Sequence, residues 1–337
     1  MPGTVFAAVT RAYKIYWCTL IVLGTCFFAV STDDRGRDVS EPVADGAYYY
    51  AYLPSVLLDR DFDFTNQYEV TKNRYSLKHT ANGMMSNVFG IGPAVFQSPA
   101  FIVGHGLALA TDSRLDGFSR WETWLSLWTA VPYTLGALFF AAKLARRRIG
   151  PGITSTLGPL VAALAGPVCY YALRQPGYAH PYATFCVAWL VETWDASYDG
   201  VAPRSLRTWL VLGVAMGAAA LARPQLLTWS AVLAFAAIDD IRRRDACPVR
   251  TIIGRWACGA LVCCIVFSPQ LIAWKCIYDA WYVVPQGAGF MRWDAPAWSE
   301  VLFSSRNGLF PWAPLYPIFF GGLFFYNSDI VIDLSWD

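Results

Sequence analysis

The sequence predicts an all-α polytopic membrane protein, with about eight transmembrane helices and a long first outer loop that contains interfacial helices. The chain of 337 residues is 56% hydrophobic and only 15% charged, with a mean hydropathy of +0.37. Soluble domains carry about 25% charged residues, so this deficit is too large for one buried core. The 15 Trp and 18 Tyr fit aromatic anchoring at membrane–water interfaces. The third observation is a series of long uncharged runs.

A helix that crosses a bilayer needs about 20 predominantly apolar residues. The first uncharged run follows Arg11 and Lys14 and shows no clear small-residue cleavage site, so we expect an uncleaved first span rather than a signal peptide. The runs that predict one span each are Ile15–Thr32, Thr123–Ala142, Ile149–Leu173, Gln175–Val191, Trp256–Trp274 and Asn307–Ser328.

A longer run, Thr208–Ile238, predicts two short spans. It has 31 residues and is interrupted only by Arg223, which Pro224 follows. Proline stops a helix, and an unpaired arginine is costly in the middle of a bilayer. We therefore expect the chain to break at "ARPQ", which brings the total to eight spans.

The stretch Asn87–Thr111 also lacks Asp, Glu, Lys and Arg. Counting it as a ninth span would place Arg146–Arg148 outside, against the rule that short cytoplasmic loops hold the excess of Lys and Arg. Its glycines and prolines instead favour broken helices at the outer interface. With eight spans and a cytoplasmic N-terminus, nearly all basic clusters lie inside.

The predicted organisation is a single transmembrane module over residues 1–337. A first outer loop runs from 33 to 122, and a second from 275 to 306. The nine cysteines lie mostly in apolar runs and show no CxxC spacing, so we infer no disulfide framework from them. Tyr48–Tyr50 are expected to be interfacial belt residues, with stacking on a sugar as the alternative.

The order of several segments resembles the GT-C superfamily of membrane glycosyltransferases, including protein O-mannosyltransferases and aminoarabinose transferases of lipid A. The segments are "ADGAYYYAYLPSVLLDRDFDFTNQYE" in the first outer loop, then "NVFGIGPAVFQSPAFI", "GAAALARPQ" and "LFSSRNGLFPWAPLYPIFFGGL". They are similar to landmarks of a bacterial group related to family 39. Many relatives pair the first acid directly with a second, whereas here Gly46 follows Asp45.

The resemblance implies an enzyme that transfers a hexose or pentose from a polyprenyl-phosphate donor to a glycan, lipid or protein acceptor of the cell envelope. It implies a bacterial inner membrane location, with the active site on the outer face. Relatives usually continue with more spans, so we expect that a C-terminal part of the chain is missing. Two alternatives stay open: a membrane transporter or flippase, or an inactive truncated partner of a glycosyltransferase.

Asp45 is the predicted catalytic base. An acceptor hydroxyl is a poor nucleophile, so a carboxylate within hydrogen-bond reach should accept its proton. The resemblance contributes most of this assignment, and the position of Asp45 shortly after the first span agrees with it. The alternative is that Asp45 caps the helix of "GAYYYAYL", a role that is compatible with catalysis.

Further residues are candidates for binding substrate. In "DFDFTNQYE", Asp63 and Glu69 could hold the acceptor or a divalent metal, with a solvated loop face as the alternative. Arg223 is expected at the outer boundary, where a cation suits a lipid phosphate, with snorkelling to lipid headgroups as the alternative. His180 is expected at the outer mouth of the fourth span, where it could orient the donor phosphate or the acceptor, or simply bond a backbone carbonyl. Arg292 and Arg306 lie in the second outer loop and could close over phosphate, or be ordinary surface arginines. No stripe of basic residues indicates nucleic-acid binding.

Overall fold

The computed structural model is a helical protein, as predicted. It describes residues 2–31, 36, 38–243, 247–287, 295–306 and 308–325, and every structural statement below concerns these residues. The helices are α1 (Pro2–Val30), α2 (Asp45–Pro54) with a π-helical extension η1 (Ser55–Asp59), α3 (Thr65–Thr71), α4 (Gly92–Ala110), α5 (Arg120–Trp128), α6 (Ala130–Ile149), α7 (Ile153–Ala165), α8 (Val168–Leu173), α9 (His180–Ala196), α10 (Leu206–Ala222), the 3₁₀ turn η2 (Pro224–Trp229), α11 (Ser230–Arg242), α12 (Val249–Tyr278), α13 (Trp298–Phe303), α14 (Leu309–Trp312) and α15 (Leu315–Phe325).

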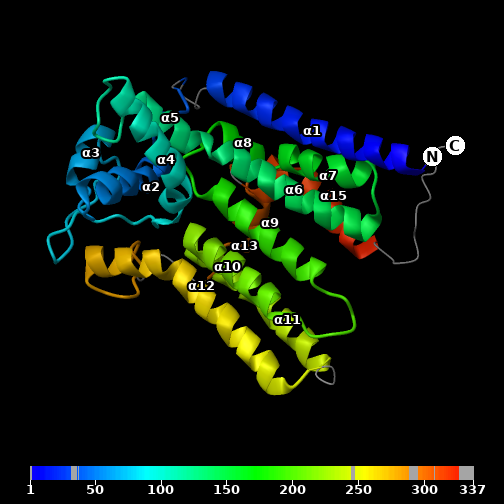
Figure 1. Ribbon diagram of the computed structural model, residues 1–337. Helices are drawn as coiled ribbons and strands as arrows, with labels where there is room; N and C mark the ends of the chain where they lie inside the picture. Colours follow the sequence, from blue (N-terminus) through cyan, green and yellow to red (C-terminus); the bar gives the residue numbers. More distant parts are fainter. Residues whose placement is uncertain are drawn as a thin grey trace.

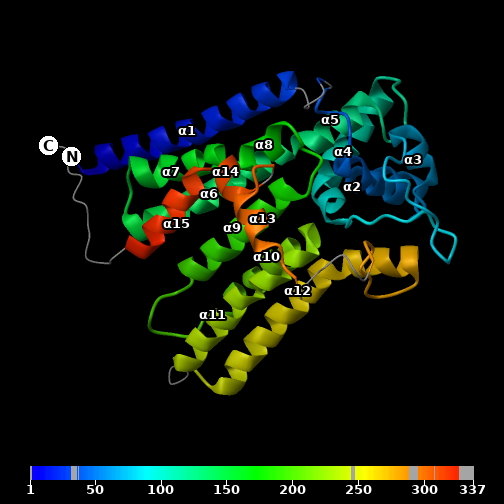
Figure 2. The same ribbon diagram turned by 180° about the vertical axis from the view of Figure 1, so that it is seen from behind.

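The helices form a bundle with a lobe at one end (Figure 1). The lobe, defined here as residues 38–119 with α5, lies beside the last turns of α12 and the start of α9. The connections from α9 to α10 and from α11 to α12 lie at the opposite end of the bundle. Seen from behind, α13, α14 and α15 run across the back of the bundle, where α15 packs on α7 (Figure 2).

Four helical segments are long and apolar enough to cross a membrane. They are Tyr13–Val30, Gly92–Ala110, Arg120–Ile149 and Val249–Tyr278, judged by length and composition over the described residues. Much of their apolar surface faces outward, with Ile21, Ile102 and Ile265 all about half exposed or more. Long apolar helices with outward-facing apolar side chains are typical of a membrane protein.

One sequence-based expectation about these segments is wrong. The stretch Asn87–Thr111 was expected to form broken helices, but α4 is a single helix of 19 residues. Pro93 lies in its first turn, where proline is tolerated, and the helix continues through Pro99. Gly92 and Gly104 are needed for packing rather than for a break. A Cβ on Gly92 would lie 1.9 Å from the Leu221 carbonyl oxygen, so α4 begins directly against α10.

Other boundaries follow the breaks in the sequence. The predicted break at "ARPQ" is confirmed, because α10 ends at Ala222 and η2 starts at Pro224. The predicted span Ile149–Leu173 is divided into α7 and α8 by Gly166 and Pro167. Helix α9 starts at His180, five residues later than the uncharged run that predicted it.

The end of the bundle opposite the lobe is held by buried ion pairs. On α6, Lys143 and Arg147 reach the Glu192 carboxylate of α9 at 2.9 and 2.8 Å, and Arg147 and Arg148 both bind Asp195. Before α10, the guanidinium of Arg204 binds Asp239, Asp240 and the Ala236 carbonyl of α11. Asp240 also accepts from the Trp209 indole at 2.8 Å. Each buried charge there has a partner, as burial of a charge requires.

The tyrosines of α2 belong to the core of the lobe. Tyr48, Tyr50 and Tyr52 are at most 2% exposed, so the expected place of Tyr48 and Tyr50 in an interfacial belt is wrong. Their hydroxyls are satisfied internally: Tyr50 donates to the Gly117 carbonyl at 2.6 Å and Tyr52 to the Phe89 carbonyl at 2.9 Å. Tyrosine supplies a large apolar body with a polar tip, and here both parts hold the lobe together.

Candidate functional site

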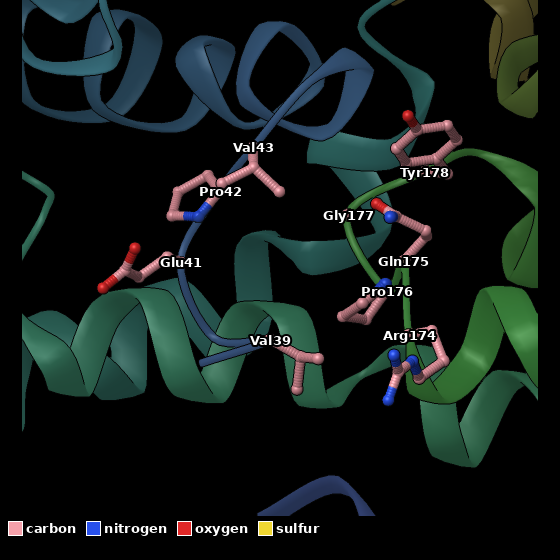
Figure 3. Close-up of a pocket in the computed structure, with 9 residues that line it drawn as sticks. All are labelled: Val39, Glu41, Pro42, Val43, Arg174, Gln175, Pro176, Gly177 and Tyr178. Carbon is pink, nitrogen blue, oxygen red and sulfur yellow. The ribbon is translucent and has the colours of Figure 1, made fainter. Parts of the chain in front are cut away.

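The candidate site begins where α2 meets the loop before α9. Gly46 and Gly177 touch through their backbones, since a Cβ on Gly46 would lie 3.1 Å from the Gly177 Cα. Any larger side chain would separate the two segments. Figure 3 shows residues 39–43, which lead into α2, and residues 174–178, which lead into α9, on either side of a cavity of about 10 Å³, a volume that holds about one water molecule. Its lining residues are Val39, Glu41, Pro42, Val43, Arg174, Gln175, Pro176, Gly177 and Tyr178.

Asp45 opens α2 at this contact. Its carboxylate makes no side-chain cap bond, and the N-cap position is Ala44. One carboxylate oxygen, Oδ1, instead accepts a short hydrogen bond from the Tyr75 phenol, 30 residues later in the chain. The Asp45 backbone hydrogen-bonds the Tyr178 phenol from the loop before α9. Asp45 therefore lies half-buried between two phenols rather than at a solvated helix end.

Tyr49, one turn further along α2, links Asp45 to the bundle. The pKa of its phenol is raised to about 12, chiefly by burial, with Arg223 lowering it and Asp45 and Tyr178 raising it by smaller amounts. All three groups are thus within electrostatic reach of one hydroxyl. With a pKa this high, the Tyr49 phenol keeps its proton at neutral pH and can act as a hydrogen-bond donor.

Arg223 and His180 form the cationic part of the site. Arg223 is the first residue after α10, and its Nη1 lies 3.2 Å from Nδ1 of His180. An arginine has no lone pair to offer, so the imidazole must accept this hydrogen bond in its neutral form. The His180 ring stacks on Tyr171 at 3.8 Å between centroids, which fixes its orientation.

Arg223 differs from the ion-paired arginines at the opposite end of the bundle. Arg147 and Arg204 each bind two carboxylates. Within the described ranges no carboxylate lies within ion-pair distance of Arg223, whose hydrogen-bonding neighbour is the uncharged His180. A half-buried guanidinium without an anion has unused capacity for one, and its planar donor fork suits phosphate.

An open cavity of about 670 Å³ begins at these two residues. It follows one face of α9 for about 16 Å, from His180 to Val191, given the helical rise per residue. Its other walls come from α6 and η2, and apolar side chains predominate. The lining residues are Ala141, Leu144, His180, Ala183, Thr184, Val187, Ala188, Val191, Arg223, Gln225, Leu226 and Trp229.

Asp63 lies away from this cluster and stabilises a turn. Its Oδ1 accepts hydrogen bonds from the Thr65 hydroxyl at 2.8 Å, the Thr65 N–H at 3.3 Å and the Met85 N–H at 3.2 Å. Burial opposes ionisation, but these hydrogen bonds outweigh it and hold the pKa of Asp63 below its usual value. The contacts tie the start of α3 to the loop that leads into α4.

Two other predicted site residues, Glu69 and Arg306, are not in contact with Asp45 or Arg223. Glu69 is exposed on α3, and Arg306 is exposed in the turn between α13 and α14. Arg292 lies outside the described residues. Over the part of the chain that the structure describes, no group of three or more His, Cys, Asp or Glu side chains is placed to hold a metal ion.

Of the predicted set, the structure joins His180 to Arg223 by a hydrogen bond. Around Asp45 it places the phenols of Tyr49, Tyr75 and Tyr178, and the Tyr178 ring lies 6.3 Å from the His180 ring. Sequence reasoning missed these phenols because eighteen tyrosines in an apolar chain were interpreted as anchors. The only available signal in the sequence was a pair of glycines. Gly46 directly follows Asp45, and Gly177 directly precedes Tyr178.

Comparison of the chain with protein-family models, with curated proteins and with solved structures finds no match in any of the three.

Proposed function

We propose that the protein is a membrane glycosyltransferase that moves a sugar from a polyprenyl-phosphate carrier to an acceptor on the outer side of the membrane. The observation that carries the proposal is the placement of Arg223, which lies 3.2 Å from the neutral His180 and lines the mouth of an apolar cavity. Asp45, at the start of α2, supplies a half-buried carboxylate that the Tyr75 phenol holds by a hydrogen bond. A base, a phosphate-binding group and a surface for a lipid chain are the three parts that this reaction needs.

The proposed reaction is a displacement at the anomeric carbon. The acceptor hydroxyl oxygen forms the new bond to that carbon while its proton passes to the Asp45 carboxylate. The bond from the anomeric carbon to the phosphate oxygen breaks, and its electron pair leaves on the carrier phosphate. Arg223 stabilises the charge that develops there, and Tyr49 can donate a hydrogen bond to the same group.

The donor's lipid chain would follow the apolar cavity. A phosphate on Arg223 lies at one end of it, and the side chains that continue along α9 are Ala183, Val187 and Val191. Burying isoprenoid carbons against them contributes about 0.8 kcal/mol for each CH₂-sized group. The site thus has a phosphate-binding group followed by an apolar surface, which matches the carrier's phosphate followed by its lipid chain.

We also propose the eight-span topology, with the lobe outside. Its support is the charge distribution: the ion-paired arginines gather at one end of the bundle, opposite the lobe. Arg204 and Arg223 flank α10 and are about 28 Å apart along a helix, close to the thickness of a bilayer core. This spacing suits one cation at each boundary.

The test is sugar transfer in native membranes that contain the Asp45→Asn and Arg223→Gln variants. Asp45→Asn should abolish incorporation of radiolabelled sugar into the acceptor fraction, because the amide cannot take the proton. Arg223→Gln should weaken binding of polyprenyl phosphate about tenfold or more, since a charged hydrogen bond contributes about 1.5–3 kcal/mol. Glu69→Gln, an exposed carboxylate of the same lobe, is the matched control and should transfer normally.

Unchanged transfer by Asp45→Asn, with normal protein levels, would remove Asp45 from the mechanism. Equal binding of polyprenyl phosphate by wild type and Arg223→Gln would remove the phosphate site, and with it the proposed function.

A further inference from the structure

The side of Asp45 that meets Tyr75 has a defined composition. Its Oδ1 is occupied by the Tyr75 phenol, and no hydrogen bond to Oδ2 is present in the described part of the chain. An acceptor hydroxyl that delivers its proton to the free oxygen must approach beside Tyr75. The neighbours of Asp45 on this side therefore select the acceptor, which the proposed function leaves open.

Tyr75 is held in place by a strained turn. Lys72, Asn73 and Ser76 all adopt positive φ, at 68°, 24° and 51°, which non-glycine residues rarely do. The Asn73 side chain closes the turn through hydrogen bonds with Leu77 at 2.9 and 3.0 Å. Such conformations persist only where the surroundings enforce them, and they are concentrated at functional sites.

The ring of Tyr75 is also fixed. It stacks on the buried Tyr48 ring with centroids 5.0 Å apart and on Phe89 at 5.9 Å. The Tyr75 backbone N–H donates to the Tyr48 phenol at 2.7 Å. Although the ring is anchored in this way, Tyr75 remains 48% exposed. The result is an oriented aromatic surface, open to solvent, with its hydroxyl on the proposed base.

Three kinds of acceptor could present a hydroxyl at this place. A fatty alcohol needs an apolar groove, but the large apolar cavity begins at Arg223 and His180 instead. A peptide needs partners for its backbone amides. A sugar ring has a flat face of C–H groups that packs on an aromatic ring, with hydroxyls at its edge that reach a carboxylate and phenols.

We propose that Tyr75 forms the acceptor subsite, and that the acceptor hydroxyl belongs to a sugar ring. This inference rests on the proposed function. Tyr75 then has two roles: its phenol positions the Asp45 carboxylate, and its ring supports the sugar whose hydroxyl is glycosylated.

The experiment measures binding of gluco-, manno- and chito-tetrasaccharides and of a threonine-rich octapeptide to the full chain in lipid nanodiscs. At least one tetrasaccharide should bind. Tyr75→Ala should weaken that binding tenfold or more, whereas Tyr75→Trp and Tyr75→Phe, which keep a ring, should stay within about threefold. In the transfer assay, Tyr75→Phe should lower kcat and leave the KM for the acceptor unchanged, because only the hydrogen bond to Asp45 is lost.

Tyr282→Ala is the matched control, because Tyr282 is another exposed tyrosine, 76% accessible, that has no contact with Asp45. It should bind saccharides as the wild type does. Equal saccharide binding by Tyr75→Ala, or binding of the octapeptide alone, would overturn the inference. If polyprenyl phosphate still binds through Arg223 in that case, the acceptor subsite has failed and the proposed function stands.

Discussion

Arg204 and Arg223, at the two ends of the bundle, differ in the partners of their guanidinium groups. Arg204 is 1% exposed in its side chain and is matched by Asp239 and Asp240. Arg223 shares its hydrogen bond with an uncharged imidazole. Removing one partner from a buried pair leaves a costly orphan charge, so the Arg204 cluster is structural. The guanidinium of Arg223 has capacity left for a ligand.

Asp63 provides a prediction at this scale. Its folded-state pKa lies below the usual value, so its contribution to stability is present above the unfolded pKa of about 3.9 and is lost as pH falls through the folded pKa. Asp63→Ala should therefore destabilise the lobe by about 1 kcal/mol at neutral pH. The difference between variant and wild type should shrink below about pH 4.

Thermal unfolding in detergent at neutral and acidic pH measures this effect. Glu69→Ala, on the same lobe but exposed, should show no such difference. A stability gap for Asp63→Ala that persists undiminished at pH 3 would contradict the assignment.

Among the elements, α4 shows what its glycines do. A Cβ on Gly92 would collide with the Leu221 carbonyl of α10, whereas nothing lies within 4 Å of a Cβ on Gly106, further along the same helix. Gly92→Ala should therefore push α4 away from α10 and lower the stability by about 1–3 kcal/mol, the usual cost of overpacking.

Gly106→Ala is the control within the same element. It should be neutral or stabilising by up to about 1 kcal/mol, because alanine is the better helix former. Gly92→Ala should lower the unfolding temperature, whereas Gly106→Ala should leave it unchanged or raise it. Equal shifts would show that a side chain at Gly92 does not strain the contact with α10.

Local sequence rules predict where a helix breaks better than they predict the contacts between helices. The break at Arg223–Pro224 could be predicted, because proline and a charge both act on the chain where they stand. The continuity of α4 could not, because glycine and proline lower helix propensity while contacts with α5 and α10 restore the helix. Gly104, for example, lies against the Trp121 and Glu122 backbone.

In the candidate site, too, some residues could be predicted from the sequence and their tertiary partners could not. Asp45, His180 and Arg223 were accessible from the sequence through a family resemblance and a count of spans. The partners Tyr75 and Tyr178 were not, because 30 and 133 residues separate them from Asp45 and no local pattern links them.

For the whole molecule, the decisive prediction concerns orientation. In a cysteine-free background, a cysteine at Glu69 in the lobe should react with a membrane-impermeant maleimide added outside intact cells. A cysteine at Asp199, exposed between α9 and α10 at the far end, should react only after permeabilisation. The reverse pattern would place the candidate site in the cytoplasm and remove the proposed donor from its reach.

The backbone contact between Gly46 and Gly177 has one further consequence. At this point no rotatable side chain lies between α2 and the loop before α9, so the separation of these two segments is set by the course of two main chains. Substitution of the surrounding aromatic residues would therefore change the surface beside Asp45, while the backbone spacing at the start of α2 stayed the same.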